Sequence, residues 1–77
     1  MKLSDIDLGK HALITKIECN DELKKRFFSF GIVKGAEVIV KNTSINKNTI
    51  EIIIENTNIA LRYDEAQSIE VELIDEM

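Results

Sequence analysis

Apolar and polar residues alternate along most of the chain, which is the pattern of half-buried β-strands. Runs of this kind predict five short strands, at 10–17, 36–41, 50–55, 59–63 and 69–73. In the first of them, Ile17 falls out of phase with Ala12 and Ile14. We therefore expect a bulge, or the end of that strand, near 15–16.

One segment has the helical period instead. Leu23, Phe27 and Phe30 are spaced by four and then three residues, which places them on one face of a helix that would pack on the sheet. Asn20 or Asp21 is suited to cap the amino end of this helix. We expect it to be the only regular helix, with no more than a single helical turn within 3–8 and at 64–67.

Two glycines follow this helix. Gly31 comes directly after it, where a left-handed residue commonly ends a helix, and only glycine adopts that conformation without a steric penalty. Ile32 would then close over the helix end through an apolar contact. Gly35 marks a second turn before the next strand. We therefore assign Gly31 and Gly35 as structural turn residues.

Strands 36–41 and 50–55 predict a hairpin whose register is limited by the face that each residue occupies. A two-residue loop at 46–47 would set the two apolar faces against each other. An odd-numbered loop or a bulge would instead allow three favourable cross-strand pairs: Val40 with Ile52, Ile39 with Ile53, and Lys41 with Glu51. The chain is expected to turn again at 56–58 and to enter a fourth strand that reaches Tyr63.

Strands this short bury their apolar faces best in a strongly bent sheet, and closing that sheet into a barrel removes its exposed edges. The predicted fold is mainly β: a small SH3-like β-barrel of five strands with one short helix after the first strand. No internal repeat, linker or low-complexity run divides the chain, so residues 1–77 are expected to form a single domain.

The composition indicates the compartment of the protein and excludes some classes of partner. Cys19 is the only cysteine, so no internal disulfide can form, and a free thiol suits a reducing cytoplasm. Residues 1–10 lack the apolar run of a signal peptide, and no stretch is long enough to span a membrane. The formal net charge of −4 disfavours binding to nucleic acid or to an anionic membrane surface. We expect a cytoplasmic protein with no nucleic-acid partner and no direct membrane insertion.

The sequence contains no arrangement typical of an enzyme. His11 is the only histidine, and it is expected at the surface beside Lys10 at a strand start. No cysteine and histidine residues have the spacing of a zinc site. The paired glycines follow a helix, whereas those of a phosphate-binding loop lead into one. We therefore predict a binding module that is not an enzyme, with no catalytic residues and no metal ligands singled out.

One surface feature points to a partner. On a helical wheel Phe28 falls on the polar side of the helix, between Lys24 and Lys25. Two interpretations stay open, namely a solvated face that carries an incidental aromatic residue and a contact site for another protein. We take Lys24, Lys25 and Phe28 as the candidate partner-binding residues.

Several pieces of the sequence, in order along nearly the whole chain, resemble the FeoA family of ferrous iron transport proteins. The matching residues are Leu3-Ser4-Asp5-Ile6 followed by Gly9, then Ala12 and Ile14, then Arg26-Phe27-x-x-Phe30-Gly31-Ile32-x-x-Gly35, and finally Ile59-Ala60-Leu61-Arg62 with Glu65-Ala66, Ile69 and Val71. The family usually has leucine or methionine where Phe27 and Phe30 stand, and proline where Lys34 stands. Neither departure touches the candidate partner-binding residues.

The resemblance implies an SH3-like fold and an accessory, regulatory role in ferrous iron uptake. Its implied partner is the cytoplasmic part of the membrane GTPase that imports ferrous iron. It implies no cofactor and leaves weak binding of Fe(II) or another divalent metal open. The alternative is a transition-metal-binding or metal-sensing domain, because similar domains end some metal-dependent repressors. Oligomeric state stays open.

Overall fold

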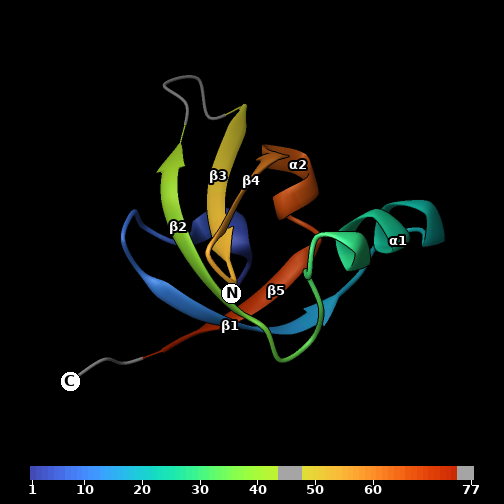
Figure 1. Ribbon diagram of the computed structural model, residues 1–77, viewed down its shortest axis with the longest axis horizontal. Coiled ribbons are helices and arrows are strands. Elements are labelled where there is room, and N and C mark those ends of the chain that lie inside the picture. Colours follow the sequence, from blue (N-terminus) through green and yellow to red (C-terminus); the bar gives the residue numbers. More distant parts are fainter. Residues whose placement is uncertain (44–47, 75–77) are drawn as a thin grey trace.

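Five antiparallel strands form one sheet in the order β4-β3-β2-β1-β5 (Figure 1). The computed structural model describes residues 1–43 and 48–74. The elements are η1 (Leu3–Asp5), β1 (His11–Ile17), α1 (Asp21–Ser29), β2 (Glu37–Thr43), β3 (Thr49–Ile54), β4 (Thr57–Arg62), α2 (Tyr63–Ala66) and β5 (Ile69–Leu73). In Figure 1, β1 and β5 cross beneath β2, β3 and β4 at a steep angle, so the sheet folds over its own inner face.

This architecture confirms the predicted small SH3-like fold. The sheet is strongly bent but not closed by strand pairing, because within the described residues β4 pairs only with β3, and the β-ladder of β5 joins it only to β1. The short helix α2 connects these two edge strands along the chain and contacts η1, β3 and β4.

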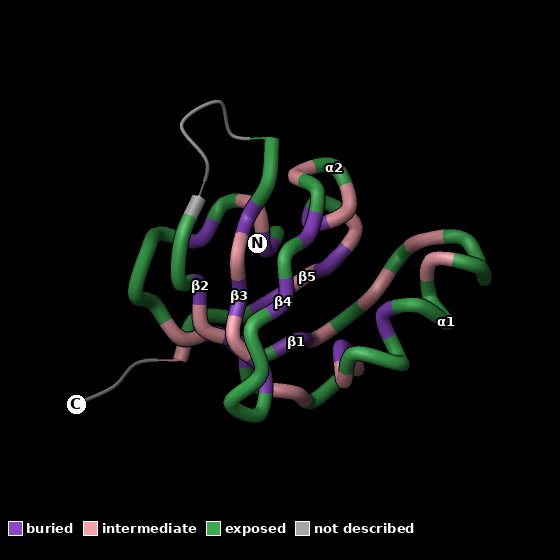
Figure 2. Tube along the Cα trace, turned by 45° about the horizontal axis from the view of Figure 1, so that its top comes forward, coloured by how far each residue is buried: buried purple, intermediate pink, exposed green. Residues whose placement is uncertain are grey.

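The core lies between the two halves of the bent sheet. Alternate positions of every strand point inward, as the alternation in the sequence predicted. Figure 2 shows these buried positions where the strands cross, whereas α1 is mostly exposed or half-buried. The inward residues of the strands are Ala12, Ile14, Val38, Val40, Ile50, Ile52, Ile54, Ile59, Leu61, Ile69 and Val71.

The hairpin register is largely as predicted. Ile39 lies opposite Ile53 and Val40 lies opposite Ile52, and the register then shifts between Val40 and Asn42, which is the expected bulge. Because the bulge inserts one residue, Asn42 rather than Lys41 lies opposite Glu51. The Lys41 amine still lies 3.5 Å from a Glu51 carboxylate oxygen. The loop at 44–47 lies outside the described residues.

The first strand also carries its predicted irregularity, because its register with β5 shifts between Ile14 and Lys16. Two boundaries further along differ from the prediction. The turn falls at Glu55–Asn56, not at 56–58, and both residues have positive φ, +51° and +66°. Two consecutive positive φ values suit the tight two-residue turn of a hairpin, so β4 starts directly at Thr57.

The end of β4 is the second difference. Tyr63 was expected in this strand but begins α2 instead. The backbone N–H of Arg62 donates to Glu65 Oε1 over 2.9 Å, so the Glu65 side chain caps the start of the helix. The single turns predicted near the amino end and after β4 correspond to η1 and α2.

Candidate partner-binding surface on helix α1

Helix α1 begins where the sequence supplies a cap. The Leu23 N–H donates to Asn20 Oδ1 over 2.8 Å, which satisfies one backbone donor that the first turn leaves open. Asp21 and Glu22 occupy the first turn, where the positive end of the helix dipole favours acidic groups. Lys24, Lys25 and Arg26 are thereby placed further along the helix.

The carboxyl end of α1 is fixed by two backbone bonds. The Ile32 N–H donates to the Phe27 carbonyl over 2.9 Å, and the Gly31 N–H donates to the Phe28 carbonyl over 3.0 Å. Gly31 has a φ of +85°, so this is the Schellman arrangement with its left-handed glycine. Both Phe27 and Ile32 are buried at this helix end. The geometry fixes the direction in which the chain leaves α1.

Gly35 redirects the chain a second time. Its φ is +92°, and its N–H donates to the Ile14 carbonyl over 2.8 Å. The Ile14 N–H in turn donates to the Ala36 carbonyl over 2.9 Å. The segment between the two glycines, which contains Lys34, is therefore held beside the middle of β1.

The predicted apolar face of α1 is only partly correct. Phe27 is fully buried and Leu23 packs partly buried against the core, but Phe30 is 39% exposed. α1 ends at Ser29, and Phe30 is its carboxyl-terminal capping residue. Its ring lies 5.8 Å from the guanidinium carbon of Arg26, at the distance of a cation–π contact.

Arg26 ties α1 to the rest of the fold through an ion pair. Its Nη1 lies 2.7 Å from Glu65 Oε2, and the side chain of Glu65 is only 13% exposed. The other oxygen of the same carboxylate caps α2, as described above. One carboxylate therefore connects two helices that are 39 residues apart in sequence.

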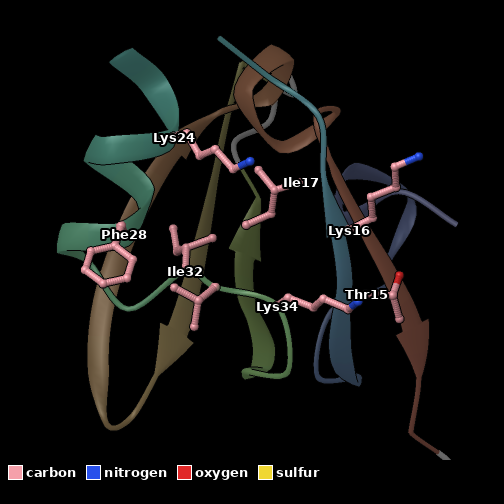
Figure 3. A pocket seen from close by; sticks show the side chains of 8 residues that line it. Thr15, Lys16, Ile17, Lys24, Phe28, Ile32 and Lys34 are labelled. Carbon is pink, nitrogen blue, oxygen red and sulfur yellow. The ribbon is translucent and has the colours of Figure 1, made fainter. Parts of the chain in front are cut away.

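Two of the three candidate residues line a groove beside α1. Phe28 is 72% exposed, and Phe28 and Lys24 form one wall of a hollow of about 440 Å³ (Figure 3). Lys25 is exposed on the same helix but does not line this groove. The structure therefore brings Lys24 and Phe28 together at one site and leaves Lys25 beside it.

The opposite wall of the groove comes from segments that the sequence did not connect with this helix. Figure 3 shows α1 on one side, β1 on the other, and the chain after Gly31 between them. The Phe28 ring lies on the same side as Ile32, the Lys24 amine reaches toward Ile17 between the walls, and the Lys34 side chain extends toward β1 near Thr15. The remaining lining residues are Lys16 and Val33.

Lys34, one of the departures from the FeoA pattern, lies at the candidate site, although neither departure was expected to touch it. This lysine, at a position where the family usually has proline, lines the same groove as Lys24 and Phe28. Sequence reasoning missed it because Lys34 follows the helix and does not appear on its wheel. The sequence does offer one sign of this position, because Lys34 places a positive charge where the family usually has an uncharged proline.

The groove is cationic and apolar, although the chain as a whole is acidic. Three lysines and no carboxylate line it, whereas the chain has a formal net charge of −4. Lys16 is partly neutralised, because its amine lies 3.2 Å from a Glu18 carboxylate oxygen. Lys24 and Lys34 make no ion pair with any residue that the structure describes. Their charges are therefore available to a bound anion.

The described residues do not assemble a metal site. In 1–43 and 48–74, no three His, Cys, Asp or Glu side chains come close enough to hold an ion. His11 Nδ1 lies 3.1 Å from Glu37 Oε1, and Cys19 is a free thiol packed partly buried against the core. Over the same ranges, no helix has the length and apolar character that crossing a membrane requires.

Comparison with known proteins decides the family. The model of the FeoA domain family matches residues 1–73. The chain belongs to the FeoA family. A Campylobacter jejuni protein that carries the name Fe(2+) transport protein A is 35% identical over 74 residues, which are 96% of this chain and 100% of that relative. The recognition of this family from the sequence is confirmed.

A second relative joins a FeoA domain to a transporter. It is the Fe(2+) transport protein A/Fe(2+) transporter FeoB fusion protein of Porphyromonas gingivalis, 32% identical over 74 residues. The match covers 96% of this chain and 9% of the fusion protein. In that organism, a FeoA domain and the FeoB transporter are therefore parts of one polypeptide.

Solved FeoA structures share the fold. The solution structure of iron(II) transport protein A from Clostridium thermocellum is 36% identical with a TM-score of 0.92, covering 96% of this chain and 46% of that chain. The FeoA of Stenotrophomonas maltophilia, solved with zinc and described as an SH3 domain protein, is 28% identical with a TM-score of 0.81, covering 94% and 89%. A manganese-dependent transcriptional repressor also contains this fold, with a TM-score of 0.88 at 20% identity over 96% of this chain and 41% of that chain.

Proposed function

We propose that this FeoA domain is a cytoplasmic accessory module of ferrous iron uptake that binds the cytoplasmic GTPase part of a FeoB-type transporter. The fusion of a homologous FeoA domain to FeoB is the observation that carries this proposal, because fusion holds two interacting domains at high effective concentration. The module regulates the transporter and performs no chemistry of its own. We assign no catalytic residue to it.

The contact surface in this proposal is the exposed side of α1, with Lys24, Lys25 and Phe28. An aromatic ring with 72% of its surface exposed gains from burial against a partner. The two lysines beside it would steer an acidic partner surface, since rim charges act mainly on the rate of association. None of the three side chains is needed by the core.

The experiment is an amide chemical-shift titration of the protein with the purified GTPase domain of its cognate transporter. We expect shifts that cluster on Lys24 to Phe28, and a loss of affinity of at least tenfold in a triple variant Lys24→Glu/Lys25→Glu/Phe28→Ala. Unchanged affinity in this variant would remove the assigned surface. No shift anywhere with the GTPase domain would remove the proposed partner.

A matched control separates local contact from net charge. The variant Lys10→Glu/Lys41→Glu/Leu8→Ala changes the same number of charges and removes one exposed apolar side chain, because Leu8 is 54% exposed. Leu8 and Lys10 precede the start of β1, and Val40, the neighbour of Lys41, bonds to the backbone of Gly9 and Lys10, so the three changes lie at the opposite end of β1 from α1 (Figure 1). The control should keep its affinity within about twofold at physiological salt, because charges beyond a Debye length are largely screened.

A further inference from the structure

The carboxyl-terminal half of β1 has an unpaired edge that faces the groove. β1 pairs with β2 only from His11 to Leu13, and the last backbone bonds on this side join Ile14 to Gly35 and Ala36. Beyond Ile14, no backbone hydrogen bond joins β1 to a described residue on the β2 side. The other edge stays paired with β5 as far as Ile17, opposite Ile69. Residues 15–17 are therefore open on one side, and the bulge between Ile14 and Lys16 lies at the start of this open edge.

The groove runs along this open edge. Thr15, Lys16 and Ile17 line it from β1, and Lys24 and Phe28 line it from α1. Figure 3 shows the strand and the helix on opposite sides of the hollow, with Ile32 between them. An unpaired strand edge next to an apolar hollow is the arrangement with which β-sheet domains bind extended peptides. Backbone hydrogen bonds give the affinity, and pockets for alternate side chains give the specificity.

The charges of the groove select the kind of peptide. The Lys24 amine reaches into the space between the walls, Lys34 extends along the groove toward β1 (Figure 3), and neither lysine has an ion pair with a described residue. The apolar part consists of Phe28, Ile17 and Ile32, with Val33. Such a surface fits a segment with carboxylates on both sides of one apolar side chain, because each carboxylate meets a free ammonium group.

We infer that this groove binds an extended acidic peptide segment, which adds to β1 as a strand along 15–17 and places one apolar side chain between Phe28 and Ile32. The inference rests on the proposed function only in that the segment would belong to the transporter partner. It goes further by naming the conformation and chemistry of what is bound. The contact is then an extra strand on the sheet and not a packing of helix against helix.

A nucleic acid is the other polyanion that lysines and an aromatic ring can bind, but the observations favour a peptide. The whole chain carries a formal net charge of −4, which repels a phosphate backbone beyond the groove. Phe28 is the one aromatic side chain in the groove, whereas single-stranded nucleic acids stack successive bases on several. An open strand edge also supplies backbone partners that a nucleic acid cannot use in register.

The test uses four synthetic peptides of about nine residues, a length that exceeds the open edge at about 3.3 Å per residue. The parent peptide alternates acidic residues around a central leucine. The second replaces its acids by amides, the third replaces leucine by serine, and the fourth carries one backbone N-methyl group beside the leucine. Each is titrated into the isotopically labelled protein and followed by amide chemical shifts and by fluorescence anisotropy.

The parent peptide should shift the amides of 15–17, Lys24, Phe28 and Lys34. The amide and serine peptides should bind about tenfold more weakly, because they lose the ion pairs or the apolar anchor. The N-methylated peptide should also lose about tenfold, because a methyl group removes a donor that strand addition needs while every side chain is kept. Equal binding of the parent and N-methylated peptides would overturn strand addition.

Protein variants supply the second arm. Lys24→Glu and Lys34→Glu should each weaken the parent peptide about fivefold and reduce the salt dependence of binding. Lys10→Glu is the matched control, because it makes the same change of charge at an exposed lysine before β1, outside the groove lining. It should change peptide affinity by less than about twofold. Equal losses in all three variants would overturn the groove as the site.

The outcomes separate this inference from the proposed function. Binding of the GTPase domain without binding of any peptide would overturn the strand-addition inference alone. Peptide binding at the groove without binding of the GTPase domain would overturn the proposed partner alone. Displacement of the parent peptide by a single-stranded oligonucleotide of similar length, with steep salt dependence, would assign the groove to nucleic acid and overturn the inference.

Discussion

Replacing Gly31 by alanine tests how the end of α1 is built. Gly31 has a φ of +85°, a conformation that costs an L-residue roughly 1–2 kcal/mol. An added Cβ would lie 3.5 Å from Ile54 Cγ2, which is an ordinary contact, so no steric clash adds to that cost. Alanine also lowers the entropy of the unfolded chain, which offsets about 0.4–1 kcal/mol. The expected net loss in the free energy of unfolding is about 1 kcal/mol.

Urea unfolding followed by circular dichroism measures this loss directly. A loss of about 1 kcal/mol in a domain of this size lowers the thermal midpoint by about 4–8 °C. Gly31→Asn is the graded control, because asparagine adopts the left-handed region more readily than alanine, and it should cost less than alanine. An alanine variant with an unchanged midpoint, or an asparagine variant less stable than alanine, would refute the reasoning from backbone conformation.

The same substitution has a consequence at the groove. The chain between Gly31 and Gly35 carries Ile32, Val33 and Lys34 into the groove lining. If alanine shifts the exit direction of this chain, the amide shifts of these three residues will change more than those of β3 and β4. The fold and the candidate site therefore depend on one backbone torsion.

Three further experiments test other parts of the structure by the same unfolding measurement. Phe27→Leu should cost about 1–2 kcal/mol because its side chain is fully buried, whereas Phe28→Leu should change stability by less than about 0.5 kcal/mol because Phe28 is 72% exposed. Asn20→Ala removes the cap of α1 and should cost about 1 kcal/mol, and an unchanged midpoint would contradict the role of its hydrogen bond to Leu23. A double-mutant cycle of Arg26→Gln and Glu65→Gln should give a coupling energy of about 1 kcal/mol, and a value near zero would mean that the ion pair does not hold α1 to the fold.

The strand register was predictable because side chains alternate between two faces of a sheet. A shift of one residue would expose the apolar face, so the sequence allows few pairings. This argument predicted the pairing of Ile39 with Ile53, together with an odd-numbered loop or a bulge, and the structure has a bulge between Val40 and Asn42.

The errors have a common physical origin, because each depends on where an element ends. Phe30 fits the helical period of Leu23 and Phe27, but it lies one residue beyond the end of α1 and is 39% exposed. Tyr63 continues the alternation of β4, but the Glu65 cap starts a helix there instead. The hydrophobic period holds within a helix or strand. The residue at which the element ends is set by local capping hydrogen bonds, which the period does not reveal.

The groove could not be predicted from the sequence, for a different reason. Its walls come from β1, α1 and the chain after Gly31, and the pairing of Ile14 with Gly35 and Ala36 is what brings them together. Lys24 and Phe28 were recognisable on a helical wheel, but their neighbour Lys34 was not. A helical wheel identifies side chains that do not face the core, and only the tertiary contacts show what they face instead.

Helix α1 contributes little to the core, which indicates that its main role is to present a surface. Among its residues only Phe27 is buried, so its contribution to the core is small. Yet the helix is capped by Asn20, ended by Gly31 and tied down by the Arg26–Glu65 ion pair. These bonds fix the orientation of a helix whose own burial would hold it weakly. A fixed orientation is what a groove needs, because Phe28 and Lys24 can form one wall only if α1 stays at a constant distance from the open edge of β1.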